Sequence, residues 1–258
     1  MFDSHAHIMF PTLTDDRTAI ISRARKAGLW GWLEIGVDIE GSRQAIALAE
    51  QEEGVYATVG VHPDDIAGLD ENGWEEVAKL ASHPKVKAIG EVGLDFYRDG
   101  KLEEQLPVLK RFIVLAREKN LPVVFHVRDG AQQSAHEELL KLLERYSSGE
   151  RPHGVIHTYS GSLAQAKRYL DLGLYLSFSG VITFKNCGEL LEVATMVPAD
   201  KMLIETDSPF LAPEPHRGKQ NEPAYVKLVA EKLGEIRGVS LEEIEKQTDA
   251  NTRTLFLI

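Results

Sequence analysis

The chain has 258 residues, of which 43% are hydrophobic and 27% charged, and its formal net charge is -11 at pH 7. This length is close to the roughly 250 residues of one TIM barrel, and the composition predicts a globular chain with a sizeable core. No apolar run approaches the ~18 residues of a membrane helix, and the acidic charge argues against broad nonspecific binding to nucleic acid.

Short apolar runs alternate with amphipathic stretches along the chain. The runs predict strands at Met1–His7, Trp30–Val37, Val55–His62, Val86–Asp95, Leu121–Arg128, Gly154–Gly161, Leu174–Gly180 and Met202–Pro209. Apolar residues at three- and four-residue spacing predict helices at Asp15–Ala27, Ser42–Glu53, Leu102–Asn120, Gln133–Tyr146, Leu163–Leu172, Pro223–Arg237 and Leu241–Leu257. Nearly continuous apolar strands that alternate with helices indicate a parallel sheet buried on both faces. We therefore expect an α/β fold in which residues 1–258 form one (β/α)8 TIM barrel. An open doubly wound sheet is the alternative, but no glycine-rich phosphate fingerprint follows the first strand.

Histidines and carboxylates gather at the C-terminal ends of the predicted strands. They are His5 and His7 on the first strand, His62 on the third, Glu91 and Asp95 on the fourth, His126 on the fifth, His157 on the sixth, and Glu205 and Asp207 on the eighth. In a barrel these strand ends converge on one face, where the active sites of this fold are built. Imidazoles and carboxylates packed together without cations would destabilise the fold, and their mixture is the ligand set for zinc, manganese and similar ions. The sequence therefore predicts a divalent-metal site at this end of the barrel.

These residues lie in motifs that resemble a known family. The segment Asp3–His7 resembles the opening motif of the amidohydrolase superfamily. Further motifs resemble the TatD family of metal-dependent deoxyribonucleases, and they are Gly60–Pro63, Ala88–Tyr97, His126–Arg128, His157–Gly161, Glu205–Pro209 and Arg217–Pro223. The order and spacing of the motifs over most of the chain make the resemblance specific. Tyr159, where relatives often carry Phe, is a conservative difference.

The resemblance implies a centre with two divalent metal ions, of zinc, manganese or magnesium. The first ion would be held by His5, His7, Glu91 and Asp207, and the second by Glu91, His126 and His157. Glu91 would bridge them, and a metal-activated water would be the nucleophile. Asp207 would orient or deprotonate this water, so the catalytic candidates are Asp207, Glu91 and His62.

Four further side chains are expected around these ligands. His62 would contact the substrate phosphate or the leaving-group oxygen, and its alternative role is that of a turn histidine. Arg128 should face the same side as His126 and bind phosphate oxygens bidentately, the alternative being a solvated surface arginine. Asp95 and Glu205 are expected to orient ligand histidines, and Glu205 is alternatively a ligand of an additional metal.

The segment Pro209–Pro223 is expected to be an ordered, non-helical loop at the pocket rim. Arg217 would bind substrate there, with Lys219 adding positive charge, unless the loop merely caps the barrel. Aromatic candidates for stacking on a nucleic-acid base are Phe96, Tyr97, Tyr159 and Phe184. Each of these rings can alternatively fill the barrel mouth.

Three functions remain open at this point. The favoured one is hydrolysis of DNA phosphodiester bonds by an exonuclease that acts on single-stranded or damaged ends, and this substrate follows from the resemblance alone. In the second, the same dinuclear site cleaves a small-molecule phosphoester, lactone or amide. The third is a non-catalytic metal-binding protein. An open cleft lined by Arg128, Arg217 and Lys219 favours nucleic acid, whereas a small closed pocket favours a metabolite.

The cellular location follows from cysteine usage and from the start of the sequence. The lone Cys187 cannot form an internal disulfide and suits a reducing compartment. Met1 leads directly into the first motif, which leaves no room for a cleavable signal peptide. We expect a cytoplasmic protein with a DNA substrate, no membrane contact and no obligate protein partner.

Overall fold

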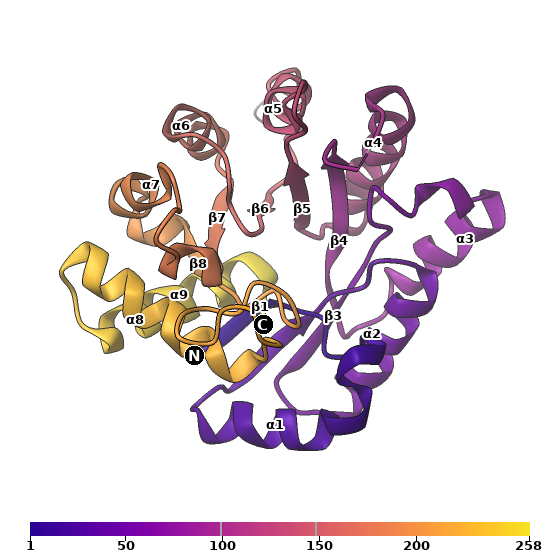
Figure 1. The fold of residues 1–258 in the computed structure, drawn as a ribbon. Coiled ribbons are helices and arrows are strands. Elements are labelled where there is room, and N and C mark those ends of the chain that lie inside the picture. The colour runs from indigo at the N-terminus through magenta and orange to yellow at the C-terminus, as the bar shows by residue number, and fades with distance from the viewer. Residues whose placement is uncertain (99, 148) are drawn as a thin grey trace.

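The computed structural model describes residues 1–98, 100–147 and 149–258. Within these ranges eight parallel strands form one sheet in the order β1 to β8 (Figure 1). Their bounds are β1 Phe2–Ala6, β2 Gly31–Glu34, β3 Val55–Val59, β4 Val86–Asp95, β5 Val123–Arg128, β6 Gly154–Ile156, β7 Tyr175–Phe178 and β8 Met202–Ile204. A parallel bridge between Ala6 and Ser208 joins the two ends of the sheet. The sheet thereby closes into the (β/α)8 barrel that the sequence predicted.

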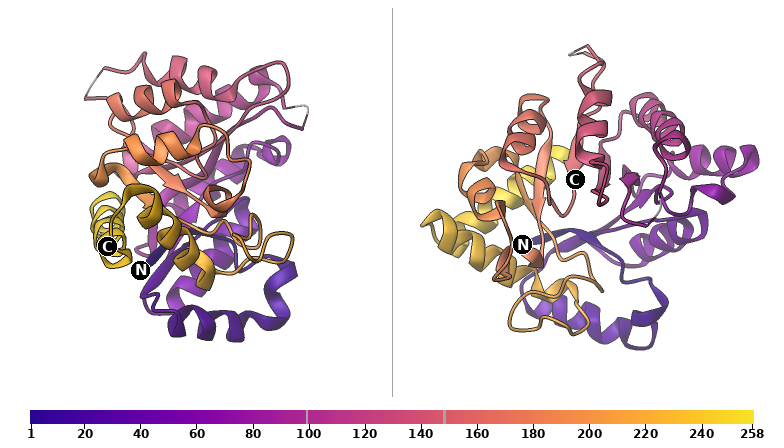
Figure 2. Two further views of the ribbon diagram at one scale, coloured as in Figure 1. Left: turned by 60° about the vertical axis from the view of Figure 1, so that its left-hand side comes forward. Right: turned by 45° about the horizontal axis from the view of Figure 1, so that its top comes forward.

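Helices surround the strands on the outside of the barrel (Figures 1 and 2). Their bounds are α1 Arg17–Lys26, α2 Ile39–Gln51, α3 Glu71–Leu80, α4 Leu102–Lys119, α5 Ala135–Leu143, α6 Leu163–Asp171, α7 Leu190–Met196, α8 Val226–Arg237 and α9 Leu241–Phe256. Short 3-10 segments are η1 Pro11–Asp16, η2 Ile66–Gly68, η3 Gly180–Thr183, η4 Ala199–Lys201 and η5 Pro223–Tyr225.

Helices α3 and α7 were not among the predicted ones. In α3 the pair Asn72 and Gly73 is a typical turn signal. The helix forms because the Asp70 side chain accepts a hydrogen bond from Gly73 N at 2.8 Å and because Trp74 and Val77 are buried. Helix α7 has only seven residues, too few to display a helical period clearly.

Six strands end earlier than predicted, at Ala6, Glu34, Val59, Ile156, Phe178 and Ile204. The histidine or carboxylate that follows β3, β6 and β8 therefore lies in a loop. Thr158 and Asp207 have φ angles of 40° and 56°, in the left-handed region. A strand cannot continue through that conformation, so the chain turns at these positions.

The interior of the barrel is packed at its N-terminal end. Most residues of the cluster that fills it come from the first half of a strand or from the end of α9, and Ile35 follows β2. The cluster contains Phe2, Leu33, Ile35, Ala88, Val124, Val155, Tyr175, Leu203, Leu255 and Phe256. A larger cluster fills the space between strands and helices. Apolar packing thus occupies one end of the barrel and leaves the C-terminal ends of the strands for polar side chains.

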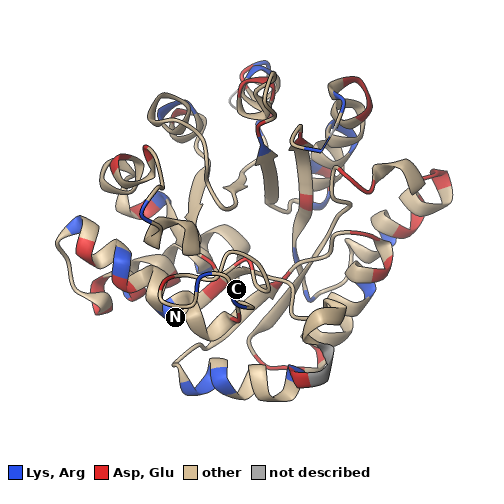
Figure 3. Cartoon of the chain, in the orientation of Figure 1, with Lys and Arg blue, Asp and Glu red and all other residues tan. Residues whose placement is uncertain are grey.

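Charged residues of both signs are mixed over the outer helices (Figure 3). The strands are largely free of them, as expected for a sheet covered on its outer face by helices. None of the helices described in the structure combines the length and the apolar character that a bilayer crossing requires.

Candidate metal centre

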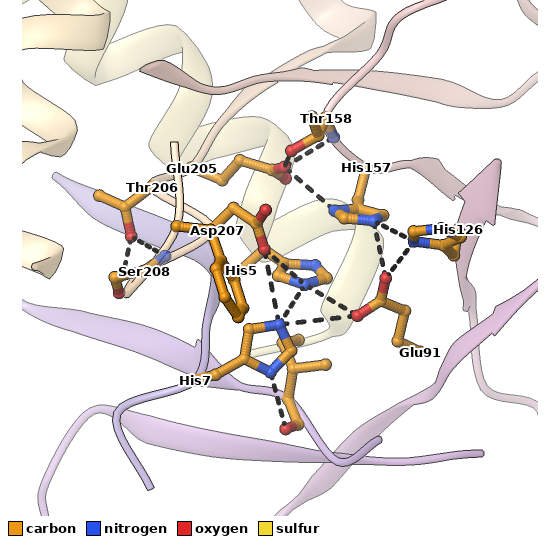
Figure 4. A network of polar contacts seen from close by, with 12 residues as sticks. His5, His7, Glu91, His126, His157, Thr158, Glu205, Thr206, Asp207 and Ser208 are labelled. Atoms are coloured by element: carbon orange, nitrogen blue, oxygen red, sulfur yellow. Dashed lines mark hydrogen bonds and ion pairs between the residues drawn. The ribbon is translucent and has the colours of Figure 1, made fainter. Parts of the chain in front are cut away.

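His5, in β1, and His7, just after it, face Asp207 at the closure between the first and last strands (Figure 4). Their Nε2 atoms are 3.1 Å apart. Asp207 Oδ1 lies 3.6 Å from His5 Nε2 and 3.5 Å from His7 Nε2. Glu91 Oε2 approaches the same two nitrogens from β4, at 3.3 and 3.6 Å. Two imidazole nitrogens and two carboxylate oxygens therefore converge on one point.

The other carboxylate oxygen of Glu91 faces a second pair of histidines. Oε1 lies 2.5 Å from Nδ1 of His126, in β5, and 2.8 Å from Nε2 of His157, directly after β6. These two ring nitrogens are 3.2 Å apart. Because each oxygen of Glu91 faces a different pair, its carboxylate lies between the two groups, at the position that the resemblance gives to a bridging ligand.

The chemistry of these donors fits a divalent cation. His5, His7 and Asp207 form one group, and Glu91, His126 and His157 form another, with the donor atoms of each group within 4.8 Å of one another. Two neutral imidazole nitrogens at hydrogen-bond distance can share only one proton, and two protonated rings would repel. A cation interacts favourably with all the lone pairs at once, and nitrogen with oxygen donors suits zinc and manganese.

Three of the imidazoles are held through their far nitrogens. His7 Nδ1 lies 3.3 Å from Ile35 O, His126 Nε2 2.9 Å from Asp95 Oδ2, and His157 Nδ1 3.3 Å from Glu205 Oε1. A proton on each of these nitrogens leaves a lone pair on the nitrogen that faces the cluster. The structure thus places Asp95 and Glu205 in contact with histidines that they were predicted to orient.

Two residues of the centre adopt the left-handed backbone conformation. Glu205 Oε1 accepts hydrogen bonds at 2.6 Å from both the backbone N and the Oγ1 of Thr158, whose φ is 40°. Asp207, with φ of 56°, donates its backbone N–H to His5 O at 2.9 Å. This conformation is unfavourable for a β-branched residue such as Thr158. It is stabilised here by tertiary hydrogen bonds, as is common at functional sites.

Asp3 links β1 to the segment after β8 behind the centre. Its Oδ1 accepts from Thr206 N at 2.9 Å and from His5 N at 3.2 Å, and its Oδ2 accepts from Thr206 Oγ1 at 2.5 Å. Burial raises the pKa of Asp3 well above its usual range. No role was predicted for Asp3, although its place two residues before His5 was a usable signal.

Opposite charges hold the carboxylates of the centre ionised. Burial alone would raise the pKa of Glu91. While the cluster nitrogens carry protons rather than a cation, the charges of His157 and His5 and the hydrogen bond from His126 Nδ1 outweigh burial, and the pKa lies well below its usual range. Burial also opposes ionisation of Glu205, but the hydrogen bond and charge of His157 lower its pKa to about 2. Two ionised carboxylates in a buried place require positive charge beside them.

Five residues of the cluster, all except the fully buried His5, line a cavity of about 530 Å³. His62, Arg128 and Asp95 also line it. Arg217 does not line the cavity, since it is exposed and its guanidinium lies over the Phe184 ring, 4.3 Å from the centroid. Lys219 is likewise exposed and outside the lining.

Contrary to the prediction, the candidate rings do not offer free faces for stacking on a base. Phe96 and Tyr159 are buried, so neither presents a face to a ligand. Tyr97 is exposed, but the Arg128 guanidinium lies 3.7 Å from its ring centroid. Several lining residues had been missed, among them Phe10, Arg98 and Phe210. Each follows a strand or its motif within a few residues, which was a signal for them.

Comparisons with known proteins identify the family of the chain. Residues 2–257 match the family described as TatD related DNase. The chain is 38% identical over 259 residues to the uncharacterized metal-dependent hydrolase YabD of Bacillus subtilis, with 100% of this chain and 99% of that protein covered. It is 36% identical over 262 residues to the 3'-5' ssDNA/RNA exonuclease TatD of Klebsiella pneumoniae, with 99% and 97% covered. The crystal structure of YJJV, a TatD homologue of Escherichia coli, superposes with a TM-score of 0.92 at 31% identity and covers 100% of this chain and 98% of that one. This chain therefore belongs to the TatD related DNase family, as its motifs predicted.

Proposed function

We propose that this protein is a divalent-metal-dependent exonuclease that hydrolyses phosphodiester bonds at single-stranded or damaged ends of DNA. The observation that carries the proposal is that one cavity is lined both by Arg128 and by five residues of the histidine–carboxylate cluster, which are His7, Glu91, His126, His157 and Asp207. A volume of about 530 Å³ is in the range of sites for small ligands, so it suits the terminal part of a nucleic-acid strand.

His5, His7 and Asp207 would hold one ion, His126 and His157 a second, and Glu91 both. Zinc, manganese and magnesium are the candidate ions. When bound, such ions polarise a phosphoryl oxygen, make water more acidic and neutralise charge that develops during displacement.

Asp207 and His62 would supply the proton chemistry. The Asp207 side chain is 12% exposed and Glu91 only 4%, so Asp207 is better placed to take a proton from an attacking water. His62 Nδ1 accepts the backbone N–H of Asp64 at 3.2 Å, which places the proton of the neutral ring on Nε2. Burial lowers the pKa of His62 to about 4, so its neutral Nε2–H can donate to a phosphate or leaving-group oxygen at pH 7.

The direct test is hydrolysis of single-stranded oligonucleotides labelled at the 5' or the 3' end by metal-reconstituted protein. We expect metal-dependent shortening from one end, abolished by a chelator and restored by metal. Asp207→Asn should lower kcat about a hundredfold or more, because a general base contributes on the order of 10²–10⁴. Asp200→Asn, an exposed substitution in η4, is the matched control. Activity that survives verified metal removal, or no cleavage with metal bound, would overturn the proposal.

Arg128→Ala is expected to weaken binding of oligonucleotides without loss of metal. Removal of charge-assisted hydrogen bonds to phosphate should raise KM about tenfold, because each is worth about 1.5–3 kcal/mol. Arg128→Lys should restore only part of this, since an ammonium cannot bind bidentately. The control is Arg111→Ala, because Arg111 also lies over an aromatic ring, that of Trp74, at 4.1 Å but outside the cavity. An unchanged KM for Arg128→Ala would remove this residue from the binding site.

One observation favours a second candidate, the hydrolysis of a small-molecule phosphoester, lactone or amide. Arg217 and Lys219 lie outside the cavity lining, so the lining offers no continuous cationic track for a long strand. The same oligonucleotide assay separates the two functions, and a negative result with metal bound leads to a panel of small esters and amides.

A further inference from the structure

The two sides of the cavity differ in chemical character. Arg98, in the loop after β4, and Arg128, at the end of β5, bring positive charge to one side. Phe10, after β1, and Phe210, after β8, bring aromatic rings to another. In the closed sheet β1 and β8 are neighbours, and β4 and β5 lie across the barrel from them. The metal-centre residues therefore lie between a cationic wall, Arg98 and Arg128, and an aromatic wall, Phe10 and Phe210.

The aromatic wall is built against a histidine of the centre. The Phe10 ring is stacked on His7, with centroids 4.7 Å apart and an interplanar angle of 28°. The Phe210 ring meets Phe10 at 5.8 Å and 77°, and His7 at 6.3 Å and 68°, both edge-to-face contacts. Phe210 nevertheless remains 48% exposed. A large part of Phe210 is thus exposed in a residue that lines the cavity and contacts His7, a candidate metal ligand.

The backbone of Phe210 is held in place by hydrogen bonds on both sides. Its N–H donates to Asp207 O at 2.9 Å, and its carbonyl oxygen accepts from Asn221 Nδ2 at 2.6 Å. The same amide nitrogen of Asn221 also donates to Thr206 O at 2.8 Å. The segment that supplies Asp207 to the centre therefore also positions Phe210 relative to it.

We propose that Phe210, supported by Phe10, is a stacking surface for a nucleobase next to the phosphodiester bond that is cleaved. The inference rests on the proposed nuclease function and deepens it by naming the part of the substrate that the aromatic wall recognises. An apolar aromatic ring beside a phosphate-binding arginine matches the two chemically different parts of a nucleotide. Every base has a π-face, so the recognition tolerates any sequence.

This arrangement selects unpaired nucleotides. A base within a duplex is already stacked between its neighbours, so it must leave the stack before it can contact Phe210. A frayed or single-stranded end offers such a base at less cost. The aromatic wall thereby gives a structural reason for a preference for single-stranded ends.

The test combines protein variants with abasic substrates. Three single-stranded oligonucleotides are compared, one intact and two with a tetrahydrofuran abasic unit on either side of the cleaved bond. For the wild type, one abasic substrate should show a kcat/KM about tenfold below that of the intact one, the loss expected for one base–aromatic stack. Phe210→Ala should lower kcat/KM for the intact oligonucleotide by the same factor and have no further effect on that abasic substrate. Phe210→Trp should restore the intact value.

Metal content and far-ultraviolet circular dichroism of each variant establish that the centre and the fold are retained. Leu191→Ala, which shortens an exposed apolar side chain of α7, is the control. If Phe210→Ala and the abasic unit each lower kcat/KM and the two losses multiply when combined, the stacking proposal is overturned while the nuclease function stands. The same holds if neither change lowers kcat/KM. A wild type that cleaves none of the three oligonucleotides would overturn the nuclease function itself, and the stacking proposal with it.

Discussion

Replacement of Glu91 by alanine is expected to cost at least one metal ion per chain and to lower kcat about a thousandfold or more. Its two carboxylate oxygens face different histidine pairs, at 3.3 Å from His5 Nε2 and 2.8 Å from His157 Nε2. Among the described residues, no other side chain of the cluster lies between the pair His5 and His7 and the pair His126 and His157. Loss of a metal removes several kcal/mol of transition-state stabilisation, and about 4 kcal/mol corresponds to a thousandfold in rate.

The measurement is elemental analysis of the purified variant together with turnover of a labelled oligonucleotide. Glu91→Gln separates the effect of charge from that of shape, because it retains the volume but loses the anion. Glu192→Ala, at an exposed position of α7, is the matched control and should retain both metal and activity. Two ions per chain with normal turnover in Glu91→Ala would rule out a bridging role for this residue.

Replacement of Gly93 by alanine is expected to lower the free energy of unfolding by about 3 kcal/mol or more. Gly93 pairs with His126 between β4 and β5. A Cβ at Gly93 would lie 1.8 Å from the carbonyl oxygen of His126, and backbone atoms cannot yield as a flexible side chain can. Overpacking of this kind typically costs about 1–3 kcal/mol, and a clash with backbone is at the upper end or beyond.

The same substitution should disturb the centre, because β5 must move and it supplies His126. Chemical denaturation gives the change in stability, and elemental analysis gives the metal content. Gly68→Ala is the control, since a Cβ there meets no atom within 4 Å and the change should stay within about 0.5 kcal/mol. A normal unfolding midpoint and full metal content in Gly93→Ala would mean that the two strands are not in such close contact.

The residues of the centre were predictable because each of them lies at or just after the end of an apolar strand. His5, Glu91 and His126 lie on strands as predicted, and the barrel brings them together. His157 and Asp207 were predicted on strands but lie in the following loops. Their neighbouring backbone, at Thr158 and at Asp207 itself, adopts a left-handed conformation that is rare for any residue other than glycine and, although more common for Asp than for Thr, is not indicated by the sequence.

The surroundings of the centre were less predictable. Phe10 and Phe210 are far apart in sequence and carry no motif that marks them as neighbours. Arg217 has a guanidinium group suited to binding phosphate, yet this group stacks on Phe184 outside the cavity. Motif position gives the place of a residue along the chain, whereas the direction of a loop side chain depends on packing with distant segments.

The sequence by itself determined the alternation of strands and helices, the barrel, the family and the set of candidate ligands. These follow from local periodicity and from the rule that parallel strands of a barrel end on one face. Only the tertiary structure decided which oxygen of Glu91 faces which pair of histidines, which histidine each of Asp95 and Glu205 contacts, and which aromatic rings remain open to the cavity. Those features are distances between side chains on different strands, and they arise only when the sheet closes and its loops pack against one another.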